Sequence, residues 1–427
     1  MNSPDTIFAL SSGPLPAGLA VVRISGPAAG MALTALAGAL PVPRMATLRR
    51  LRDPADRSPL DDAIVLWFPG PASATGEDTA ELHLHGGRAV AAAVLAVLGR
   101  LPGLRPADPG EFTRRGFDNG RMDLTAIEGL GDLLRAETEG QRRAALAMAE
   151  GGLARAVAQW QDHLLGIAAR VEAILDFDDE DDVAVDLAAL RSDVATMAHA
   201  LQALIAAPPA ERLHDGLRVV IAGPPNAGKS TLLNALVGRE AAIVSAIAGT
   251  TRDVIEAPVV LGGIPFLFAD TAGLRDAPDE IEAIGVARAE ARITGADILL
   301  WLGDPAAAPD HPGLMPIAAK QDIAPPPTAP ATPVSAKTGT GLPELIAALI
   351  ARAQSMLPPT DAIALNQRQR SVLIDVVQAL SRAARLIDPL LLAEELRQAR
   401  LGFDRLTGRA GVEDLLDRLF SGFCIGK

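Results

Sequence analysis

Hydrophobic and polar positions along the 427-residue chain follow two different periods. Short apolar or β-branched runs typical of strands occur before residue 90 and again after residue 216, and Ala/Leu-rich stretches with a helical period of about 3.6 residues follow each strand-rich region. Glycines 262 and 263 join two of the strand patterns as a hairpin. The predicted strands are 18–24, 63–68, 79–84, 217–222, 254–261 and 264–269, and the predicted helical stretches are 88–101, 125–176, 187–207, 231–237, 367–384 and 390–406.

A phosphate-binding loop is the strongest local motif. Residues 223–230 read GPPNAGKS, with a predicted strand before them and a predicted helix after them. Glycines let the backbone wrap closely around phosphate oxygens, and N–H groups at the helix start form a cradle for anions. Lys229 would reach the β- and γ-phosphates and Ser230 would ligate magnesium. The nucleotide contacts expected in this loop are Asn226, Ala227, Gly228, Lys229, Ser230 and Thr231.

Two further motifs follow in the order expected for a guanine-nucleotide site. Thr250 and Thr251 lie in AGTTRD, where Thr251 can complete the magnesium shell when the loop closes over the γ-phosphate. Asp270 ends an apolar strand and begins DTAG, so its carboxylate would hold a magnesium-bound water. The contacts expected here are Ser245, Ala246, Ile247, Ala248, Gly249, Thr250, Thr251, Asp270, Thr271, Ala272 and Gly273.

Base recognition departs from the usual pattern Asn-Lys-x-Asp, because residues 319–322 read AKQD. Asp322 can accept from the N1–H and N2–H₂ groups of guanine, and the Lys320 stem can cover the base, whereas Ala319 has no amide to offer. We therefore predict that guanine preference survives with weakened affinity. The supporting loop is expected to contribute Ser335, Ala336 and Lys337.

Four prolines between residues 305 and 316 leave room for a short loop and a strand before Lys320, but hardly for a helix. A trimmed nucleotide domain and a degenerating base site are both compatible with this pattern. Leu274 follows DTAG, where Ras-like proteins place a glutamine that positions water. Glu282 is the candidate replacement, since a carboxylate can hold the water or accept its proton. A solvated glutamate on a polar helix face is the other reading of this residue.

Two sets of helical stretches bracket the nucleotide-binding region, which indicates an inserted domain. We predict a multidomain protein with α/β and all-α parts: an α+β domain at 1–118, a helical domain made of 119–213 and 358–427, and between its two segments a Ras-like P-loop domain at 214–357.

Composition limits the possible partners and compartment. The net charge of −13 disfavours nonspecific binding of nucleic acid, so an RNA-linked role needs a local basic patch or a partner protein. Cys424 is the only cysteine, which excludes a disulfide within the chain and suits a reducing compartment. We find no signal peptide and no membrane-spanning run, and we expect a soluble, cytoplasmic protein without a membrane partner.

Several segments outside the nucleotide motifs carry a family resemblance. These are DTIFAL (5–10), VVRISG (21–26), WFPGP (67–71), TGED (75–78), HGG (85–87), PGEFTRRGFDNGRMDL (109–124) and FCIGK (423–427). On them the chain resembles, essentially end to end, the MnmE/TrmE family of tRNA modification GTPases. The nucleotide motifs are shared by many GTPases, whereas the two terminal segments are specific to this family.

The resemblance implies a GTPase that uses potassium in place of an arginine finger. Asn226, Ser245, Ile247 and Thr250 match the family's potassium ligands, and Glu282 matches its catalytic glutamate. A monovalent cation beside the β–γ bridge neutralises developing charge. In the family, hydrolysis accompanies dimerisation of the two nucleotide-binding domains across the nucleotide.

The resemblance also implies a homodimer whose first domain binds a 5-formyltetrahydrofolate-type one-carbon donor. Arg23, Glu81, Arg121 and Lys427 match the folate-contacting positions, with Arg121 standing where lysine is usual. The family acts with an FAD-binding partner protein, as a heterotetramer, on carbon 5 of the wobble uridine of certain tRNAs. The cofactors implied are GTP, magnesium, potassium and folate, with FAD on the partner.

Other interpretations stay open at this point. A GTP-switched RNA or ribosome assembly factor without modification chemistry would share GPPNAGKS and DTAG, but not FCIGK or VVRISG. A generic P-loop ATPase is disfavoured by Asp322 and by the loop 335–337. His83 and His85 alternate as on one strand face, where a structural role is favoured over a metal site because no third ligand is evident.

Overall fold

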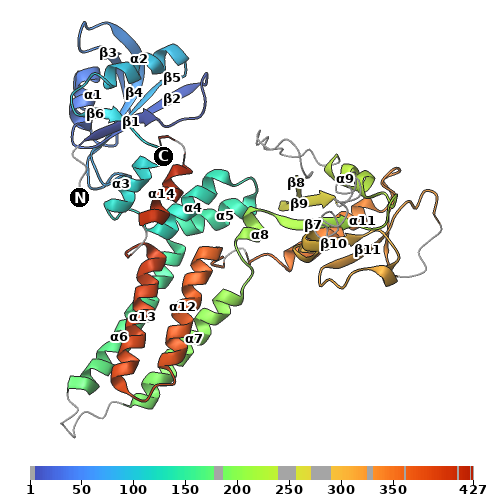
Figure 1. The fold of residues 1–427 in the computed structure, drawn as a ribbon. Coiled ribbons are helices and arrows are strands. Elements are labelled where there is room, and N and C mark those ends of the chain that lie inside the picture. Colours follow the sequence, from blue (N-terminus) through green and yellow to red (C-terminus); the bar gives the residue numbers. More distant parts are fainter. Residues whose placement is uncertain are drawn as a thin grey trace, which may run out of the picture. The chain divides into compact units, whose positions relative to one another are not determined.

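The chain forms two compact units (Figure 1). The computed structural model describes residues 5–176, 186–238, 256–270, 290–324, 330–359, 362–410, 413–423 and 425–426, without the side chains of 413–415 and 418. The first unit comprises Met1–Gly131, Met148–Arg191 and Arg382–Lys427, and the second comprises Asp132–Ala147 and Ser192–Ser381. Within the described ranges, every helix is too short or too polar to span a lipid bilayer.

A six-stranded sheet organises the N-terminal part of the first unit. Its strand order is β3-β4-β5-β2-β1-β6, and all neighbours are antiparallel except the parallel pair β1 and β6. The strands are β1 Thr6–Leu10, β2 Leu19–Ser25, β3 Thr47–Arg52, β4 Pro59–Phe68, β5 Thr79–His85 and β6 Leu104–Pro106.

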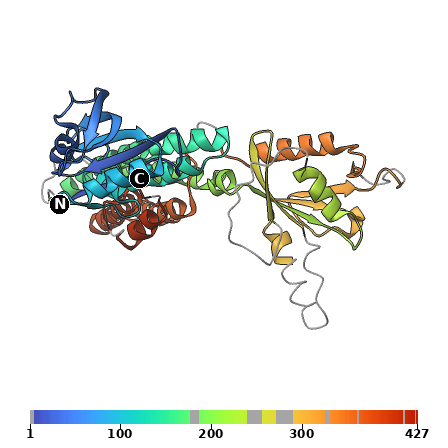
Figure 2. The ribbon, with the colours of Figure 1, turned by 90° about the horizontal axis from the view of Figure 1, so that it is seen from above.

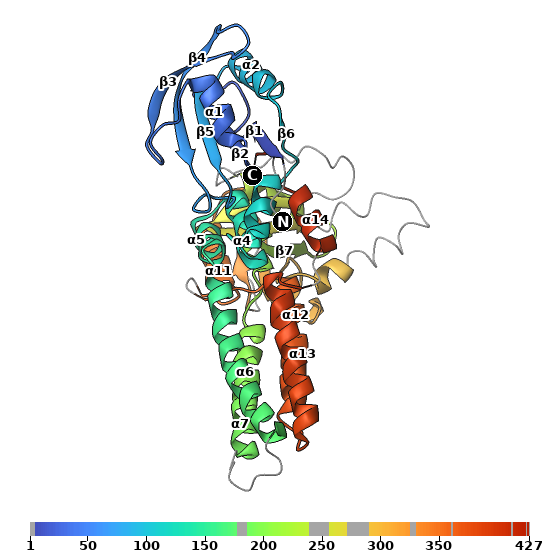
Figure 3. The same cartoon turned by 90° about the vertical axis from the view of Figure 1, so that its left-hand side faces the viewer.

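Alternation of side chains along these strands decides what each face of the sheet contacts. Ala20, Val22 and Ile24 of β2 are fully buried on the face that is covered by α1 (Ala29–Ala37) and α2 (Arg88–Leu98), as Figure 3 shows. The predicted strands are present here with slightly shifted ends. The predicted helix 88–101 ends earlier, at Leu98, where Gly99 caps it.

The opposite face of the sheet meets α3 (Glu111–Asp118), whose Phe112 packs with Ile7, Ala9 and Ala107. Further along the first unit, α6 (Gly152–Asp176) runs beside α13 (Pro389–Thr407) in Figures 1 and 3. Their rings Trp160 and Phe403 stack at 5.9 Å between centroids. The last helix, α14, spans Glu413–Ser421.

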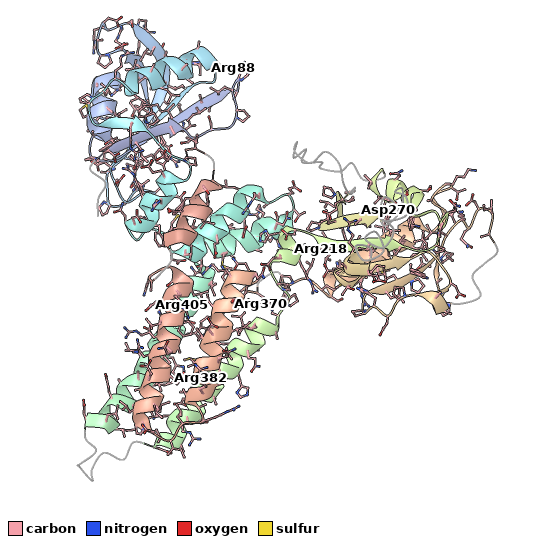
Figure 4. All side chains as sticks on the ribbon, in the orientation of Figure 1. Arg88, Arg218, Asp270, Arg370, Arg382 and Arg405 are labelled. Atoms are coloured by element: carbon pink, nitrogen blue, oxygen red, sulfur yellow. The ribbon has the colours of Figure 1, made fainter. Side chains whose placement is uncertain are left out.

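The remaining helices include several that run across the division between the units. The predicted stretch 125–176 forms three helices. The first break lies where the Gln141 side chain accepts from the N–H of Glu137 and Thr138, and the second lies at Gly151, which adopts a left-handed φ of 79°. Arg370 donates to the carbonyl oxygens of residues 205 and 207 (Figure 4). These helices are α4 Leu124–Arg135, α5 Glu139–Ala149, α7 Leu187–Ala206, α8 Glu211–His214 and α12 Gln367–Ala383.

A second six-stranded sheet organises the second unit, with strand order β12-β11-β10-β7-β9-β8. All its neighbours are parallel except the antiparallel edge pair β8 and β9. The helices α9 and α11 pack on one face of this sheet, and Figure 2 shows α11 lying along it. The elements are β7 Leu217–Ala222, α9 Lys229–Val237, β8 Glu256–Leu261, β9 Ile264–Asp270, β10 Ile298–Trp301, β11 Leu314–Ala318, β12 Thr332–Pro333 and α11 Leu342–Gln354.

The hairpin and the shortened connection predicted in this region are both present. Gly262 and Gly263 adopt φ of 57° and 79°, as a tight two-residue turn between β8 and β9 requires. Between β10 and β11, residues 302–313 contain only the three-residue 3₁₀ helix η2 (Pro305–Ala307). The prolines of this connection thus leave no α-helix between the two strands.

Candidate functional site

The phosphate loop lies between the end of β7 and the first turn of α9. Gly223, Asn226 and Gly228 adopt positive φ of 148°, 60° and 100°, which bends the backbone around the start of the helix. Lys229 is buried, and its ammonium donates to the carbonyl oxygens of Gly223 and Pro224 at 3.1 and 3.0 Å. The ammonium of Lys229 therefore closes the loop, and the anion cradle formed by its N–H groups lies at the N-terminus of α9.

Two of the predicted magnesium-associated residues are in direct contact. Ser230 on α9 donates its hydroxyl hydrogen to Oδ2 of Asp270 at 2.6 Å, and Asp270 lies at the end of β9 (Figure 4). The parallel pairing of β7 with β9, with Ile221 opposite Asp270, sets the carboxylate beside the phosphate loop. A hydroxyl and a carboxylate are oxygen donors of the kind that magnesium prefers, so the residues fit the ion.

The base-recognition residues line a cavity of about 260 Å³. Parallel pairing of β11 with β12 sets Ala318 beside Pro333 and so brings the two base loops together. Ser335 is fully buried and donates its hydroxyl hydrogen to Oδ1 of Asp322 at 2.8 Å. The lining includes Gly228, Ala319, Lys320, Asp322, Ala336 and Lys337.

Lys320 connects the base cavity to the phosphate loop. It adopts φ of 60°, and its ammonium donates to the carbonyl oxygen of Asn226 at 2.5 Å. The sequence spacing of 94 residues gave no indication of this contact. It joins two motifs that had been predicted independently, so the phosphate loop and the base-loop cavity form one continuous candidate site within the second unit.

Several predicted residues lie outside the described residues. They are the expected switch, potassium and water-positioning positions Ser245, Ala246, Ile247, Ala248, Gly249, Thr250, Thr251, Thr271, Ala272, Gly273 and Glu282, together with Leu274, Cys424 and Lys427.

The predicted folate positions divide into two places in the first unit. Arg23 on β2 lies opposite Glu81 on β5 and donates to its carboxylate at 2.9 and 3.0 Å, while His83 lies 3.2 Å from the same carboxylate. Burial acts to raise the pKa of Glu81, but the charge of Arg23 and the hydrogen bonds outweigh it and hold that pKa below its usual value. Arg121 instead donates to the carbonyl oxygen of Ser73 at 3.1 Å.

Two features of the first unit were not predicted from the sequence. One is a cavity of about 520 Å³ whose lining includes Phe8, Leu10, Gly13, Pro14, Leu95 and Ile425. The other is Arg115, a buried guanidinium that pairs with Asp5, Glu77 and Glu111. The segments TGED and PGEF contain two of these carboxylates, but spacing alone does not reveal that they share one arginine.

Comparison with known proteins places the whole chain in one family. A family model described as the MnmE helical domain matches residues 124–424, and one described as the GTP-binding protein TrmE N-terminus matches residues 6–121. The chain belongs to the MnmE family of tRNA modification GTPases. The multidomain fold predicted from the sequence, with α/β and all-α parts, is confirmed.

Relatives named tRNA modification GTPase MnmE match at full length. The one from Rhizorhabdus wittichii is 58% identical and covers 100% of this chain and 98% of its own length. Those from Novosphingobium aromaticivorans and Erythrobacter litoralis are 57% and 53% identical, each over 99% of this chain and 100% of its own length. A solved structure of Aquifex aeolicus Era with GDP·AlF4⁻ is 25% identical over 40% of this chain and 69% of its own, with a TM-score of 0.24, too low to bear on fold or function.

Proposed function

We propose that this protein hydrolyses GTP in the modification of carbon 5 of the wobble uridine of certain tRNAs, of the carboxymethylaminomethyl or aminomethyl type. The observation that carries the proposal is that one chain combines a continuous phosphate and base site with a TrmE N-terminal segment at residues 6–121. We further propose that it acts in the cytoplasm, as a homodimer, with an FAD-binding partner protein. These last points rest on family membership alone.

The decisive experiment measures the wobble nucleosides of tRNA from cells that lack the gene. Complementation with the wild-type chain should restore the modified uridine, and complementation with Lys229→Ala should not, because the ammonium at the phosphate loop is lost. Normal tRNA in the deletion strain would refute the proposal.

Magnesium, when bound, would neutralise charge on the β- and γ-phosphates. In the described part of the chain, Ser230 would ligate it and Asp270 would hold a magnesium-bound water, and we propose Thr251 as a further ligand. The hydrogen bond of 2.6 Å between Ser230 and Asp270 keeps the hydroxyl and carboxylate oxygens on the same side of the phosphate loop. Ser230→Ala should therefore weaken GTP binding more in the presence of magnesium than in its absence.

We propose a potassium site at Asn226, Ser245, Ile247 and Thr250, with Glu282 positioning the attacking water. Asn226 fits this role because its side-chain amide carries an oxygen suited to a hard cation, and its φ of 60° places it in the phosphate loop beside the start of α9. The test compares GTP turnover in potassium and sodium salts, with Asn226→Ala and Glu282→Ala as variants. Equal turnover of the wild-type chain in both salts would remove potassium from the mechanism.

A folate one-carbon donor is the proposed ligand of the first domain, contacted by Arg23, Glu81, Arg121 and Lys427. The 520 Å³ cavity of the first unit, whose lining includes Phe8, Leu95 and Ile425, is large and apolar enough for a flat heteroaromatic ring, but Arg23, Glu81 and Arg121 are not part of its lining. Calorimetric titration of the full chain with 5-formyltetrahydrofolate tests this. The domain division 1–118, 119–213 with 358–427, and 214–357 is part of the same proposal.

A further inference from the structure

The base cavity offers an unequal set of partners to a purine. Asp322 presents a carboxylate whose Oδ1 is fixed by the hydroxyl of the fully buried Ser335 at 2.8 Å. Ala319 lines the same cavity with a methyl group, which packs against the buried core of the second sheet. The cavity therefore offers a preorganised acceptor at Asp322 and a methyl group at Ala319.

Guanine has donors on one edge and acceptors on another. N1–H and N2–H₂ donate, and O6 and N7 accept. The carboxylate of Asp322 matches the donors. The backbone N–H of Ala336, which also lines the cavity, donates to no backbone acceptor in the described part of the chain and is thus available to O6.

N7 has no amide partner at position 319. An asparagine at position 319 would supply a carboxamide N–H, and alanine supplies none. The ammonium of Lys320 donates to the carbonyl oxygen of Asn226, and Lys337 is an exposed residue. Position 319 therefore offers N7 a methyl group and no hydrogen-bond donor.

We propose that this chain reads guanine through N1, N2 and O6 and leaves N7 unread. Its substrate class is then guanine nucleotides irrespective of the chemistry at position 7, including 7-deaza analogues with a small substituent there. The inference rests on the proposed binding of guanine nucleotide in this cavity. It makes residue 319 the position that decides whether N7 contributes to affinity.

The test measures the dissociation constants of GDP, 7-deaza-GDP and inosine diphosphate for the full chain by calorimetry. The wild-type chain should bind GDP and 7-deaza-GDP within a factor of about 2, since no hydrogen bond is lost. Inosine diphosphate should bind at least about 10-fold more weakly, since it lacks the N2 donors that Asp322 accepts from.

The Ala319→Asn variant supplies the matched comparison. It should bind GDP more tightly and should discriminate against 7-deaza-GDP by about 3-fold to 10-fold, the value of one hydrogen bond. Thermal unfolding with and without GDP checks that it is folded, and Ala319→Ser, whose side chain is shorter than that of asparagine and carries no amide, should keep the wild-type ratio.

The outcomes separate the inference from the proposed function. Discrimination against 7-deaza-GDP by the wild-type chain of more than about 2-fold overturns the inference while leaving GTP binding intact. A ratio that stays at 1 in folded Ala319→Asn shows that residue 319 does not face N7 and also overturns it. Failure of the wild-type chain to bind GDP at all refutes the proposed function together with the inference.

Discussion

Replacing Arg115 by methionine should release α3 from the first sheet. The Arg115 side chain is only 5% exposed, and its guanidinium donates to Asp5, Glu77 and Glu111 at 2.9, 3.1 and 3.1 Å. Methionine has a similar length and is apolar, so it fills the space but removes the charge. Three carboxylates then lose a common partner.

The structure sets the size of the effect. Breaking a buried ion pair by removing one partner costs about 3–5 kcal/mol, because the other charge stays buried without compensation. Arg105 still contacts Asp5 and Glu111, each at 2.5 Å, so these two remain partly neutralised. Glu77 is 7% exposed and has Arg115 as its only ion-pair partner among the described residues. We therefore expect the lower end of the range, about 3 kcal/mol.

Hydrogen exchange on the full chain is the suitable assay, since unfolding of several domains is not a two-state process. Peptides from β1 and α3 should lose about 3 kcal/mol of protection in Arg115→Met. The control is Arg50→Met, which removes an exposed arginine paired with Asp62 and should leave protection unchanged. Protection of α3 within about 0.5 kcal/mol of wild type in Arg115→Met would refute the reasoning.

Three further predictions follow from single contacts. Ser335→Ala should weaken GTP binding by about 10-fold or more in calorimetry, because a hydrogen bond to a charged group contributes about 1.5–3 kcal/mol, whereas Thr338→Ala, on the exposed part of the loop, should not. Gly223→Ala should abolish GTP binding, since Gly223 has a φ of 148° and the added Cβ would lie 3.0 Å from the backbone of Leu302. Circular dichroism should show that this variant remains folded. Burial acts to raise the pKa of Glu111, but hydrogen bonds from Arg105, the backbone and Arg115 outweigh it and lower that pKa below 4.5. The ionised Glu111 therefore contributes its full stabilisation above about pH 4.5, and this stabilisation is lost as the pH falls through the pKa of the folded state. Exchange protection factors of α3, referenced to the intrinsic rate at each pH, should be level above pH 4.5 and fall below it; protection that rises on acidification would contradict this sign.

The sequence by itself determined the features whose cause is local. Gly262-Gly263 predicts a hairpin because few other residues adopt two positive φ values in succession, and the hairpin is there with those angles. GPPNAGKS predicts a phosphate loop because its glycines and its lysine act within one turn of chain. The prolines between β10 and β11 exclude an α-helix for an equally local reason, the missing N–H and the fixed φ.

Tertiary structure decided the features that join distant segments. Lys320 meets the carbonyl of Asn226, and Arg115 meets Asp5 and Glu77, across 94, 110 and 38 residues. Such contacts depend on strand order and on the direction in which each side chain leaves its strand or helix, and neither the period of a pattern nor the spacing of a motif contains that information. The sequence could show that position 319 lacks an amide. Only the packing of β11 beside β12 placed Ala319 on the wall of a cavity that also contains the fixed carboxylate of Asp322. The missing amide therefore bears on which base the cavity selects.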